Sequence, residues 1–320
     1  MLSGKVLITG GSGFLGRAII RRAQNEKWPC DITVYSRDET KQDELKHKYP
    51  AVTCILGDVS RDLDRLIAVM HGFDTVIHAA AVKYIDAAEY NIFETIDVNI
   101  KGSQNVAIAA RAAGVETVVG ISTDKACQPA NIYGLTKGVM EKIFVEANKN
   151  TKTRFVTCRY GNVVGSTGSV IPKFRQQLKE LGSFSVTDSK MTRFWIGVDQ
   201  AIDLILWSVN SAEEYPGRVF IPFCPGMRTV DVAKCVFYES GTKGDPKISY
   251  TGIRPGEKLH ESLFSPQEAP RVWQCNPNGF IMDPATVPAH SPDMMEYTSD
   301  HAKPLDVEDM LKFMKDSALV

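Results

Sequence analysis

The sequence predicts an α/β protein with a Rossmann-like doubly wound parallel sheet and a smaller C-terminal substrate-binding domain. Three observations predict it. Short apolar runs alternate with amphipathic segments, a glycine-rich turn follows the first run, and the alternation weakens after about residue 165. Strands that alternate with helices form parallel sheets covered on both faces. Right-handed crossovers then make the sheet doubly wound.

The predicted strands follow one another at regular intervals along the first half of the chain. The first, Lys5–Thr9, ends at glycines and precedes a helical pattern from Leu15 to Gln24. Amphipathic segments at 99–113 and 133–148 predict two further helices. Five more runs predict strands: DITVYSR, VTCILGD, DTVIHAAA, TVVGIST and RFVTCRYGNV.

Proline and glycine become frequent in the second half, which predicts a smaller and less regular domain. Val198–Val209 is amphipathic and is expected to pack back on the first domain. Asp306 is available to cap a closing helix, whereas 283–304 has little periodicity. The expected division is an NADP-binding domain over 1–165, to which 197–222 return, and a substrate-binding domain over 166–196 and 223–320.

Composition excludes several classes of function. The chain has 320 residues and a formal net charge of -1, which gives no argument for nucleic-acid or membrane partners. No apolar run approaches the length of a membrane span, and no signal-peptide pattern opens the chain. Its seven cysteines match neither a zinc site nor a disulfide framework. We therefore expect a cytoplasmic protein with reduced thiols and no metal.

A glycine-rich turn, Gly10-x-x-Gly13-x-x-Gly16, follows the first strand and opens a helix. Glycines let the backbone approach a pyrophosphate, which then lies at the positive helix N-terminus. The strand–turn–helix context favours dinucleotide binding over a plain turn. The residues expected to contact the cofactor here are Gly10, Ser12, Gly13, Phe14, Leu15 and Gly16.

The end of the second strand favours NADP over NAD. NAD-binding proteins usually have an acid there for the ribose 2′-hydroxyl, but this chain has Tyr35-Ser36-Arg37, with Lys41 one turn on. Ser36 can donate to a phosphate that Arg37 and Lys41 neutralise. In the alternative, both cations are solvated and Asp38 takes the ribose.

Other cofactor contacts are expected at the ends of the third and fourth strands. Asp58 is expected to accept from the adenine amino group, and small alanines let the cofactor lie close to the backbone. His78 is expected to be a packed strand-end residue. Lys83 lies just past the carboxyl end of its strand, where ligands bind in such sheets. This set comprises Asp58, Val59, Ala79, Ala80, Ala81, Lys83 and Asn99.

Tyr133 and Lys137 lie four residues apart and share one helix face. A lysine ammonium and an oxidised nicotinamide both favour tyrosinate, so we expect the Tyr133 pKa to be lowered. Lys137 can also hold the nicotinamide ribose, and Ser122 or Thr123 can supply a hydroxyl beside the tyrosine. The pattern predicts hydride transfer, although a chance pair on a surface helix has the same spacing.

Asp124 and Lys125 place a carboxyl group beside an amine just upstream. Oxidation of an alcohol to a ketone makes the neighbouring C–H acidic. A base can then remove that proton while an acid expels a hydroxyl from the next carbon. The pair would suit this elimination, but spacing alone favours an ordinary ion pair at a strand end.

Several longer motifs resemble the extended short-chain dehydrogenase/reductases, specifically the inverting UDP-N-acetylglucosamine 4,6-dehydratases (5-epimerising) of pseudaminic-acid and related pathways. Most sugar dehydratases of this superfamily have Asp-Glu where this chain has Asp124-Lys125, and C5-retaining relatives tend to have Met in place of Tyr133. The last 50 residues do not share the resemblance. The motifs are VLITGGSGFLG, VYSRDETKQ, HAAAVKYIDAAEYN, ISTDKACQPANIYGLTK, CRYGNVVGSTGSVIPKF, MTRFWI and GIRPGEKLHE.

The resemblance implies a catalytic cycle without net redox change. Tyr133 would take the sugar 4-hydroxyl proton as hydride goes to NADP, Lys125 the C5 proton, and Asp124 would protonate the departing 6-hydroxyl. Hydride would return to C6, and C5 would be reprotonated on its opposite face. The product would be UDP-2-acetamido-2,6-dideoxy-β-L-arabino-hex-4-ulose. We expect a depressed pKa for Lys125, crowded by Lys83, Lys137 and the nicotinamide.

The resemblance also implies contacts to the UDP-sugar substrate. We separately expect a homo-oligomer. Two alternatives stay open: a UDP-sugar 4-epimerase, which would have no use for the pair at 124 and 125, and a non-catalytic NADP-binding sensor. The residues expected to contact the substrate are Lys83, Asn162, Lys173, Arg193, Arg254 and Glu257.

Overall fold

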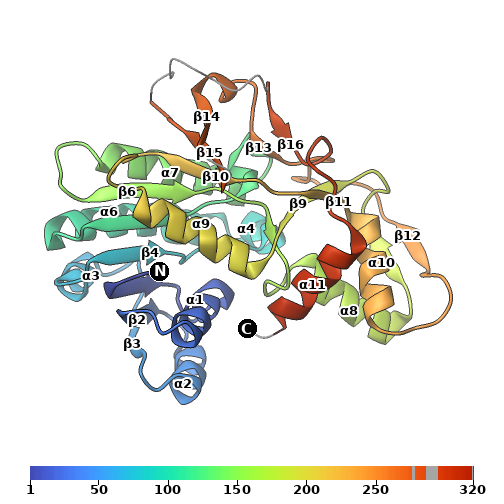
Figure 1. Cartoon of the computed structure of the whole chain (residues 1–320), viewed down its shortest axis with the longest axis horizontal. Coiled ribbons are helices and arrows are strands. Elements are labelled where there is room, and N and C mark those ends of the chain that lie inside the picture. Colours follow the sequence, from blue (N-terminus) through green and yellow to red (C-terminus); the bar gives the residue numbers. More distant parts are fainter. Residues whose placement is uncertain (276–277, 286–294, 319) are drawn as a thin grey trace.

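A computed structural model describes residues 1–275, 278–285, 295–318 and 320. Its largest element is a nine-stranded sheet in the order β14-β15-β10-β6-β5-β4-β1-β2-β3, parallel from β10 to β3 and antiparallel at β14 and β15 (Figure 1). The part from β3 to β6 has the doubly wound order of dinucleotide-binding proteins. Its strands are β1 Gly4–Thr9, β2 Cys30–Ser36, β3 Thr53–Leu56, β4 Thr75–His78, β5 Thr117–Ile121, β6 Arg154–Cys158, β10 Val219–Pro222, β14 Val272–Cys275 and β15 Gly279–Met282.

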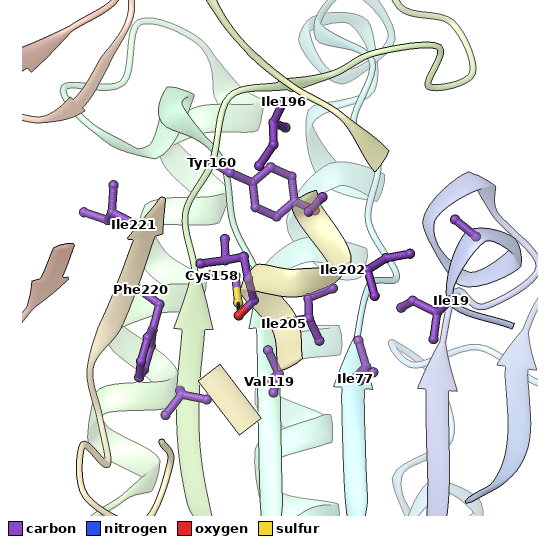
Figure 2. Close-up of a cluster of buried hydrophobic side chains, with 14 of the residues drawn as sticks. Ile19, Ile77, Val119, Cys158, Tyr160, Ile196, Ile202, Ile205, Phe220 and Ile221 are labelled. Carbon is purple, nitrogen blue, oxygen red and sulfur yellow. Dashed lines mark hydrogen bonds between the residues drawn. The ribbon is translucent and has the colours of Figure 1, made fainter. Parts of the chain in front are cut away.

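Helices cover both faces of this sheet. Successive strand residues point to opposite faces, so apolar strand residues contact a layer of helices on each side. Ile77 and Val119 pack with Ile202 and Ile205 in one cluster (Figure 2), and Val76 and Val118 belong to another. All six of these side chains are fully buried. The first face carries α1 Phe14–Asn25, α2 Glu39–Lys48 and α9 Val198–Asn210; the second carries α3 Leu63–Met70, α6 Gly102–Ala113 and α7 Ile132–Ala147.

A smaller region packs beyond the carboxyl ends of the parallel strands and has its own core. Phe174, Phe184, Trp195 and Met310 are buried in it, and α10 packs against both α8 and α11 (Figure 1). Its strands are β7 Asn162–Val163, β8 Phe184–Val186, β9 Thr192–Ile196, β11 Gly226–Arg228, β12 Ile248–Tyr250, β13 Ser262–Phe264 and β16 Tyr297–Thr298. Its helices are α8 Val170–Leu181, α10 Thr229–Glu239 and α11 Val307–Ser317.

Short helices connect these elements near the site. A π-helical turn precedes α6, and a 3₁₀ turn follows β5. No helix among the described residues has the length and apolar character needed to cross a bilayer. The connecting helices are α4 Ile85–Tyr90, α5 Ile92–Ile96, η1 Asp97–Lys101, η2 Asp124–Ala126 and η3 Ala269–Arg271.

The predicted fold class is confirmed, with two differences in detail. The sixth predicted strand ends at Cys158, and Asn162–Val163 form β7 in a separate three-stranded sheet. The segment 272–282 was expected in the smaller region, but β14 and β15 extend the large sheet through β10. Asp306 does cap α11, accepting the Asp309 N–H. Part of the 283–304 segment lies outside the described residues.

Candidate active site

A cavity of about 670 Å³ opens at the carboxyl ends of β1, β4 and β5. Parallel sheets with this strand order bind ligands at that edge. The glycine-rich turn lines one part of the cavity, and Lys125, Tyr133 and Lys137 line another. One continuous space therefore faces both the predicted cofactor residues and the predicted acid–base groups.

The glycine-rich turn is built for close approach. Gly10 has a φ of 69°, and a Cβ there would lie 2.7 Å from the backbone of Ala80. A Cβ on Gly16 would lie 2.2 Å from the Gly11 carbonyl oxygen, so only glycine lets α1 pack this closely. The N-terminus of α1 has no side-chain cap, which leaves its N–H groups available to an anion.

The expected contacts of this turn divide into two kinds. Gly10, Gly13, Phe14 and Leu15 line the cavity. Ser12 is buried and Gly16 packs the helix on the turn, so these two shape the loop without lining the space.

Two of the cations predicted to select the cofactor line the same cavity, and both already have acidic partners. Arg37 Nη1 lies 2.6 Å from Glu94 and 3.4 Å from Asp58. Lys41 pairs with Asp38 at 2.5 Å. Asp38 also accepts the Lys41 N–H as the cap of α2, so its carboxylate has a role in folding the helix.

Several residues that were predicted to contact the cofactor do not line the cavity and lie behind the residues that do. Ser36 is buried, and its hydroxyl accepts from Gln42. Asp58 accepts from the N–H and hydroxyl of Ser60, and Val59 is buried in the core.

Asn99, which was also predicted to contact the cofactor, does not line the cavity, and its side chain makes three hydrogen bonds within the protein. Its Oδ1 accepts the Val82 N–H at 2.8 Å, and its Nδ2 donates to the Val82 carbonyl and to Thr136, both at 3.0 Å. It holds the loop after β4 in place instead of facing the cavity.

The end of β4 behaves as predicted. His78 is fully buried between Thr9 and Ser103, and burial lowers its pKa to about 3, so the ring is neutral. The three alanines that follow it and Lys83 line the cavity. The expectation that His78 is a packed strand-end residue is confirmed.

Tyr133 and Lys137 lie on α7, which begins where Asn131 accepts the Gly134 N–H at 2.8 Å. A Cβ on Gly134 would lie 2.1 Å from the Lys125 carbonyl oxygen. This glycine therefore sets how closely the tyrosine helix approaches the turn that carries Lys125.

The expected lowering of the Tyr133 pKa is wrong for the protein alone. Burial raises the pKa of Tyr133 to about 12, and the opposing positive charge is that of Lys125. Burial also lowers the pKa of Lys137 to about 7. Thr123 acts in the opposite direction and lowers the Tyr133 pKa, although its hydroxyl donates to Asp124 in the structure. Ser122 donates to Glu141 at 2.6 Å, which identifies Thr123 as the hydroxyl beside the tyrosine.

Lys125 contacts three acceptors. Its Nζ lies 2.9 Å from Asp124 Oδ1, 3.3 Å from Asn162 Oδ1 and 3.6 Å from Glu261 Oε1. Asp124 is fully buried, and its Oδ2 has no hydrogen-bond partner. We call Asp124, Lys125 and Glu261 the Lys125 cluster.

The expected depression of the Lys125 pKa is also wrong. Burial acts in that direction, but the carboxylates of Asp124 and Glu261 outweigh it and raise the pKa. The prediction placed cations around this amine, whereas the fold surrounds it with acids. Sequence reasoning missed Glu261, and its position in GIRPGEKLHE was the available signal.

The predicted substrate residues are only partly brought together. Asn162 and Lys83 line the cavity. Arg193 is buried and donates to the carbonyls of Thr192 and Leu259. Lys173 is exposed on α8 and lies outside the cavity lining.

Arg254 lies on the surface in an acidic setting. It pairs with Glu257 at 2.5 Å and with Asp86 at 3.4 Å. Neither Arg254 nor Glu257 lines the cavity.

A second buried group of charges joins the two regions close by. Arg159 uses all five of its N–H donors: on Glu141, on Glu268 and on the Leu263 carbonyl, at 2.5 to 3.0 Å. Burial alone would raise the pKa of Glu268, but Arg159 brings it down to about 2. We call Arg159, Glu141 and Glu268 the Arg159 network; sequence reasoning did not detect it.

The fold and the Tyr133–Lys137 pair in the cavity define the protein as an extended short-chain dehydrogenase/reductase. Residues 6–278 match the model of a family described as polysaccharide biosynthesis protein, and the chain belongs to that family.

Proteins of similar sequence indicate which activities this chain resembles. A UDP-N-acetylglucosamine 4,6-dehydratase (inverting) of Campylobacter jejuni is 42% identical, over 84% of this chain and 80% of the relative. A UDP-glucose 4-epimerase of Rickettsia bellii is 37% identical, over 82% and 78%. The resemblance to the inverting dehydratase family, inferred from the motifs, is confirmed.

Solved structures agree with the fold. The X-ray structure of Pen from Bacillus thuringiensis is 32% identical, covers 99% of this chain and 98% of its own, and has a TM-score of 0.87. The dTDP-glucose 4,6-dehydratase DesIV of Streptomyces venezuelae, solved with NAD and TYD, is 20% identical, with a TM-score of 0.70 and coverage of 80% and 86%. The second likeness concerns the fold alone.

Proposed function

We propose that this protein is an inverting nucleotide-sugar 4,6-dehydratase that acts on UDP-N-acetylglucosamine with NADP as its catalytic cofactor. The observation that carries the proposal is that Lys125 and Tyr133 face one cavity, with Asp124 bonded to the amine at 2.9 Å. A simple alcohol dehydrogenase needs the tyrosine but not the acid–base pair. The inverting dehydratase relative supports the same reading.

The cavity fits a dinucleotide. Gly10 and Gly16 leave no room for a Cβ, and the uncapped N-terminus of α1 suits a pyrophosphate. The cofactor would accept hydride from C4 and return it to C6. Arg37 and Lys41 at the rim favour a 2′-phosphate, which supports NADP over NAD, although each would have to leave a carboxylate to meet it.

Tyr133 would begin the reaction by taking the proton of the sugar 4-hydroxyl. Because burial raises its pKa to about 12, it needs positive charge nearby to act as a base. Lys125 supplies such a charge, and the nearby Thr123 hydroxyl, which donates to Asp124 Oδ1 in the structure, also lowers the Tyr133 pKa. Lys137, on the same helix face one turn later, would bind the nicotinamide ribose.

Asp124 and Lys125 would carry out the elimination. With Asp124 ionised and Lys125 protonated, neither group is in the form that the step requires. Transfer of one proton along their 2.9 Å contact produces a neutral amine and a protonated acid together. The amine can then remove the C5 proton and the acid can protonate the departing 6-hydroxyl. Addition of a proton to the opposite face of C5 completes the inversion.

The contacts to the substrate remain part of the proposal. Asn162 and Lys83 line the cavity and would meet the sugar or diphosphate. Arg193, Arg254, Lys173 and Glu257 would have to approach the UDP part from the smaller region. Of these, Arg254 already pairs with Glu257 and would exchange that partner for phosphate.

We also propose a cytoplasmic homo-oligomer that serves a pseudaminic-acid or related surface-sugar pathway. Six cysteines of the described chain are unpaired, as in a reducing compartment. Tyr90 and Phe93 are 89% and 87% exposed on adjacent short helices, which favours association. The family description, polysaccharide biosynthesis protein, supports the pathway.

A UDP-sugar 4-epimerase is the second candidate because relatives with that name are 36–37% identical. Incubation with UDP-N-acetylglucosamine in heavy water separates the two functions. A dehydratase yields a product lighter by one water with deuterium at C5, whereas an epimerase yields a product of unchanged composition. Recovery of unreacted sugar from purified, cofactor-loaded protein would contradict both.

A further inference from the structure

Glu261 is a buried carboxylate that the proposed reaction does not yet use. Its side chain is 4% exposed, and it lies just before β13 in the smaller region. The chain is anchored there because the Glu261 N–H donates to the Ser299 hydroxyl, and the Ser299 N–H donates to the Glu261 carbonyl. The smaller region thus presents this carboxylate to Lys125, which belongs to the large sheet.

The contacts of Lys125 are those of an ammonium. Nζ donates hydrogen bonds to Asp124 and Asn162 and forms an ion pair with Glu261 at 3.6 Å. An ammonium has three donors and no lone pair, so an amine held in this way cannot act as a base. The proposed elimination therefore requires Lys125 to lose a proton, and Glu261 lies where it opposes that loss.

Other charges that face this cluster come from three further elements. Arg193 on β9 has its Nε 3.9 Å from Glu261 Oε1, and Lys258 has its Nζ 3.4 Å from Oε2. Tyr133 on α7 interacts with Lys125. Two cations therefore restrain the influence of Glu261 on the amine.

Glu261 differs from an acid that only stabilises the fold. Its Oε2 is buried without a hydrogen bond of good geometry, and Asp124 Oδ2 on the other side of the amine is also unpartnered. Buried polar atoms are normally satisfied, and exceptions require an explanation. The unsatisfied oxygens lie on the two carboxylates that flank the reactive amine.

We propose that Glu261 is a positioning residue that holds the Lys125 amine charged in the free enzyme, with Lys258 as the counter-charge that limits its effect. This inference rests on the proposed function. Glu261 never takes the proton; the proton leaves Lys125 for Asp124. Glu261→Gln and Lys258→Met should then shift the titration of Lys125 in opposite directions. A general loss of packing would not produce opposite shifts.

The experiment measures the titration of Lys125 directly. Trace labelling of the full-length protein with acetic anhydride at a series of pH values, followed by peptide mass spectrometry, gives the pH at which this amine becomes reactive. In Glu261→Gln the midpoint should fall by about one pH unit or more, and in Lys258→Met it should rise by a similar amount. Glu257→Gln, which removes a nearby acid paired with Arg254, is the matched control and should leave the midpoint unchanged.

The pH profile of dehydration provides the second readout. The acid limb of the rate should move to lower pH in Glu261→Gln and to higher pH in Lys258→Met. Midpoints that move in the same direction in both variants, or in neither, overturn the inference. Opposite midpoint shifts in a protein that dehydrates no nucleotide sugar would support the charge control of Lys125 while refuting the proposed function.

Discussion

The Lys125 cluster and the Arg159 network are both buried, both charged, and both link the large sheet to the smaller region. In the Arg159 network every guanidinium donor has an acceptor, and no oxygen of Glu141 or Glu268 lacks a partner. In the Lys125 cluster two carboxylate oxygens have none. No residue of the Arg159 network lines the cavity, whereas Lys125 does.

This contrast distinguishes charges that stabilise the fold from charges that are available for chemistry. Leaving a buried polar atom unsatisfied costs about 1–3 kcal/mol, so the Lys125 cluster reduces stability where it stands. Because every hydrogen-bonding group of the Arg159 network has a partner, the network rigidly connects the large sheet to the smaller region. The predictions below test this contrast, beginning with the largest expected effect.

Replacing Lys125 by Met should abolish dehydration. We expect the rate of water elimination to fall by at least about 10²-fold, the lower range for loss of a general base. The free energy of unfolding should also fall, because Met leaves the buried carboxylates of Asp124 and Glu261 without their cation. Bound NADP should still be reduced when the substrate is added, although more slowly, because Tyr133 loses the positive charge of Lys125. Absorbance of the reduced nicotinamide would follow this step. Normal turnover by this variant would contradict the role of Lys125.

Replacing Arg159 by Met should have its main effect on stability. The substitution leaves Glu141 and Glu268 buried without their cation, which costs about 3–5 kcal/mol. Urea unfolding monitored by circular dichroism would measure the loss. Arg175→Met is the matched control, since Arg175 pairs with Glu239 at the surface and should cost less than about 1 kcal/mol. Equal losses of unfolding free energy in the two variants would show that the Arg159 network stabilises the fold no more than a surface ion pair does.

Acid should weaken the Arg159 network in a defined pH range. Arg159 holds the pKa of Glu268 at about 2, below its ordinary value of 4.5. Because the folded pKa is the lower one, this stabilisation is complete above about pH 4.5 and is lost as the pH falls towards 2. Its size is at most about 3 kcal/mol. The stability difference between wild type and Glu268→Gln should shrink over this range; a constant difference would refute the assignment.

The smallest expected effect concerns the spacing between Tyr133 and Lys125. An alanine at Gly134 would place its Cβ 2.1 Å from the Lys125 carbonyl oxygen and displace the turn. We expect activity to fall by about tenfold, because small misplacements at a reacting centre are costly. Gly138→Ala is the control on the same helix, since its Cβ meets nothing closer than 3.5 Å. Similar rates for both variants would show that Gly134 does not set the spacing.

Local patterns in the sequence predicted much of the large sheet. The turn at Gly10, the pair at Tyr133 and Lys137, and the alternation of strands and helices each depend on residues close together in the chain. Physical rules for short segments were therefore enough to predict these features. The same rules predicted that His78 is a packed strand-end residue, and its ring is buried and neutral.

Contacts distant in sequence were not predictable in the same way. Glu261 meets Lys125 across 136 positions, and Glu268 meets Arg159 across 109. The signs of the Lys125 and Tyr133 pKa shifts depend on such partners and on burial, so both expectations failed. β14 and β15 were missed for a related reason, since antiparallel edge strands carry no helix between them to reveal the register.

The edge position of β14 and β15 has a consequence for synthesis of the chain. By the time residue 165 has left the ribosome, every residue needed for hydride chemistry exists, but β6 still lacks its neighbour β10 on one side. The acids at 261 and 268 emerge some hundred residues later. A shortened product ending before Met282 should consequently be an aggregating fragment, and not a working dehydrogenase with one function removed.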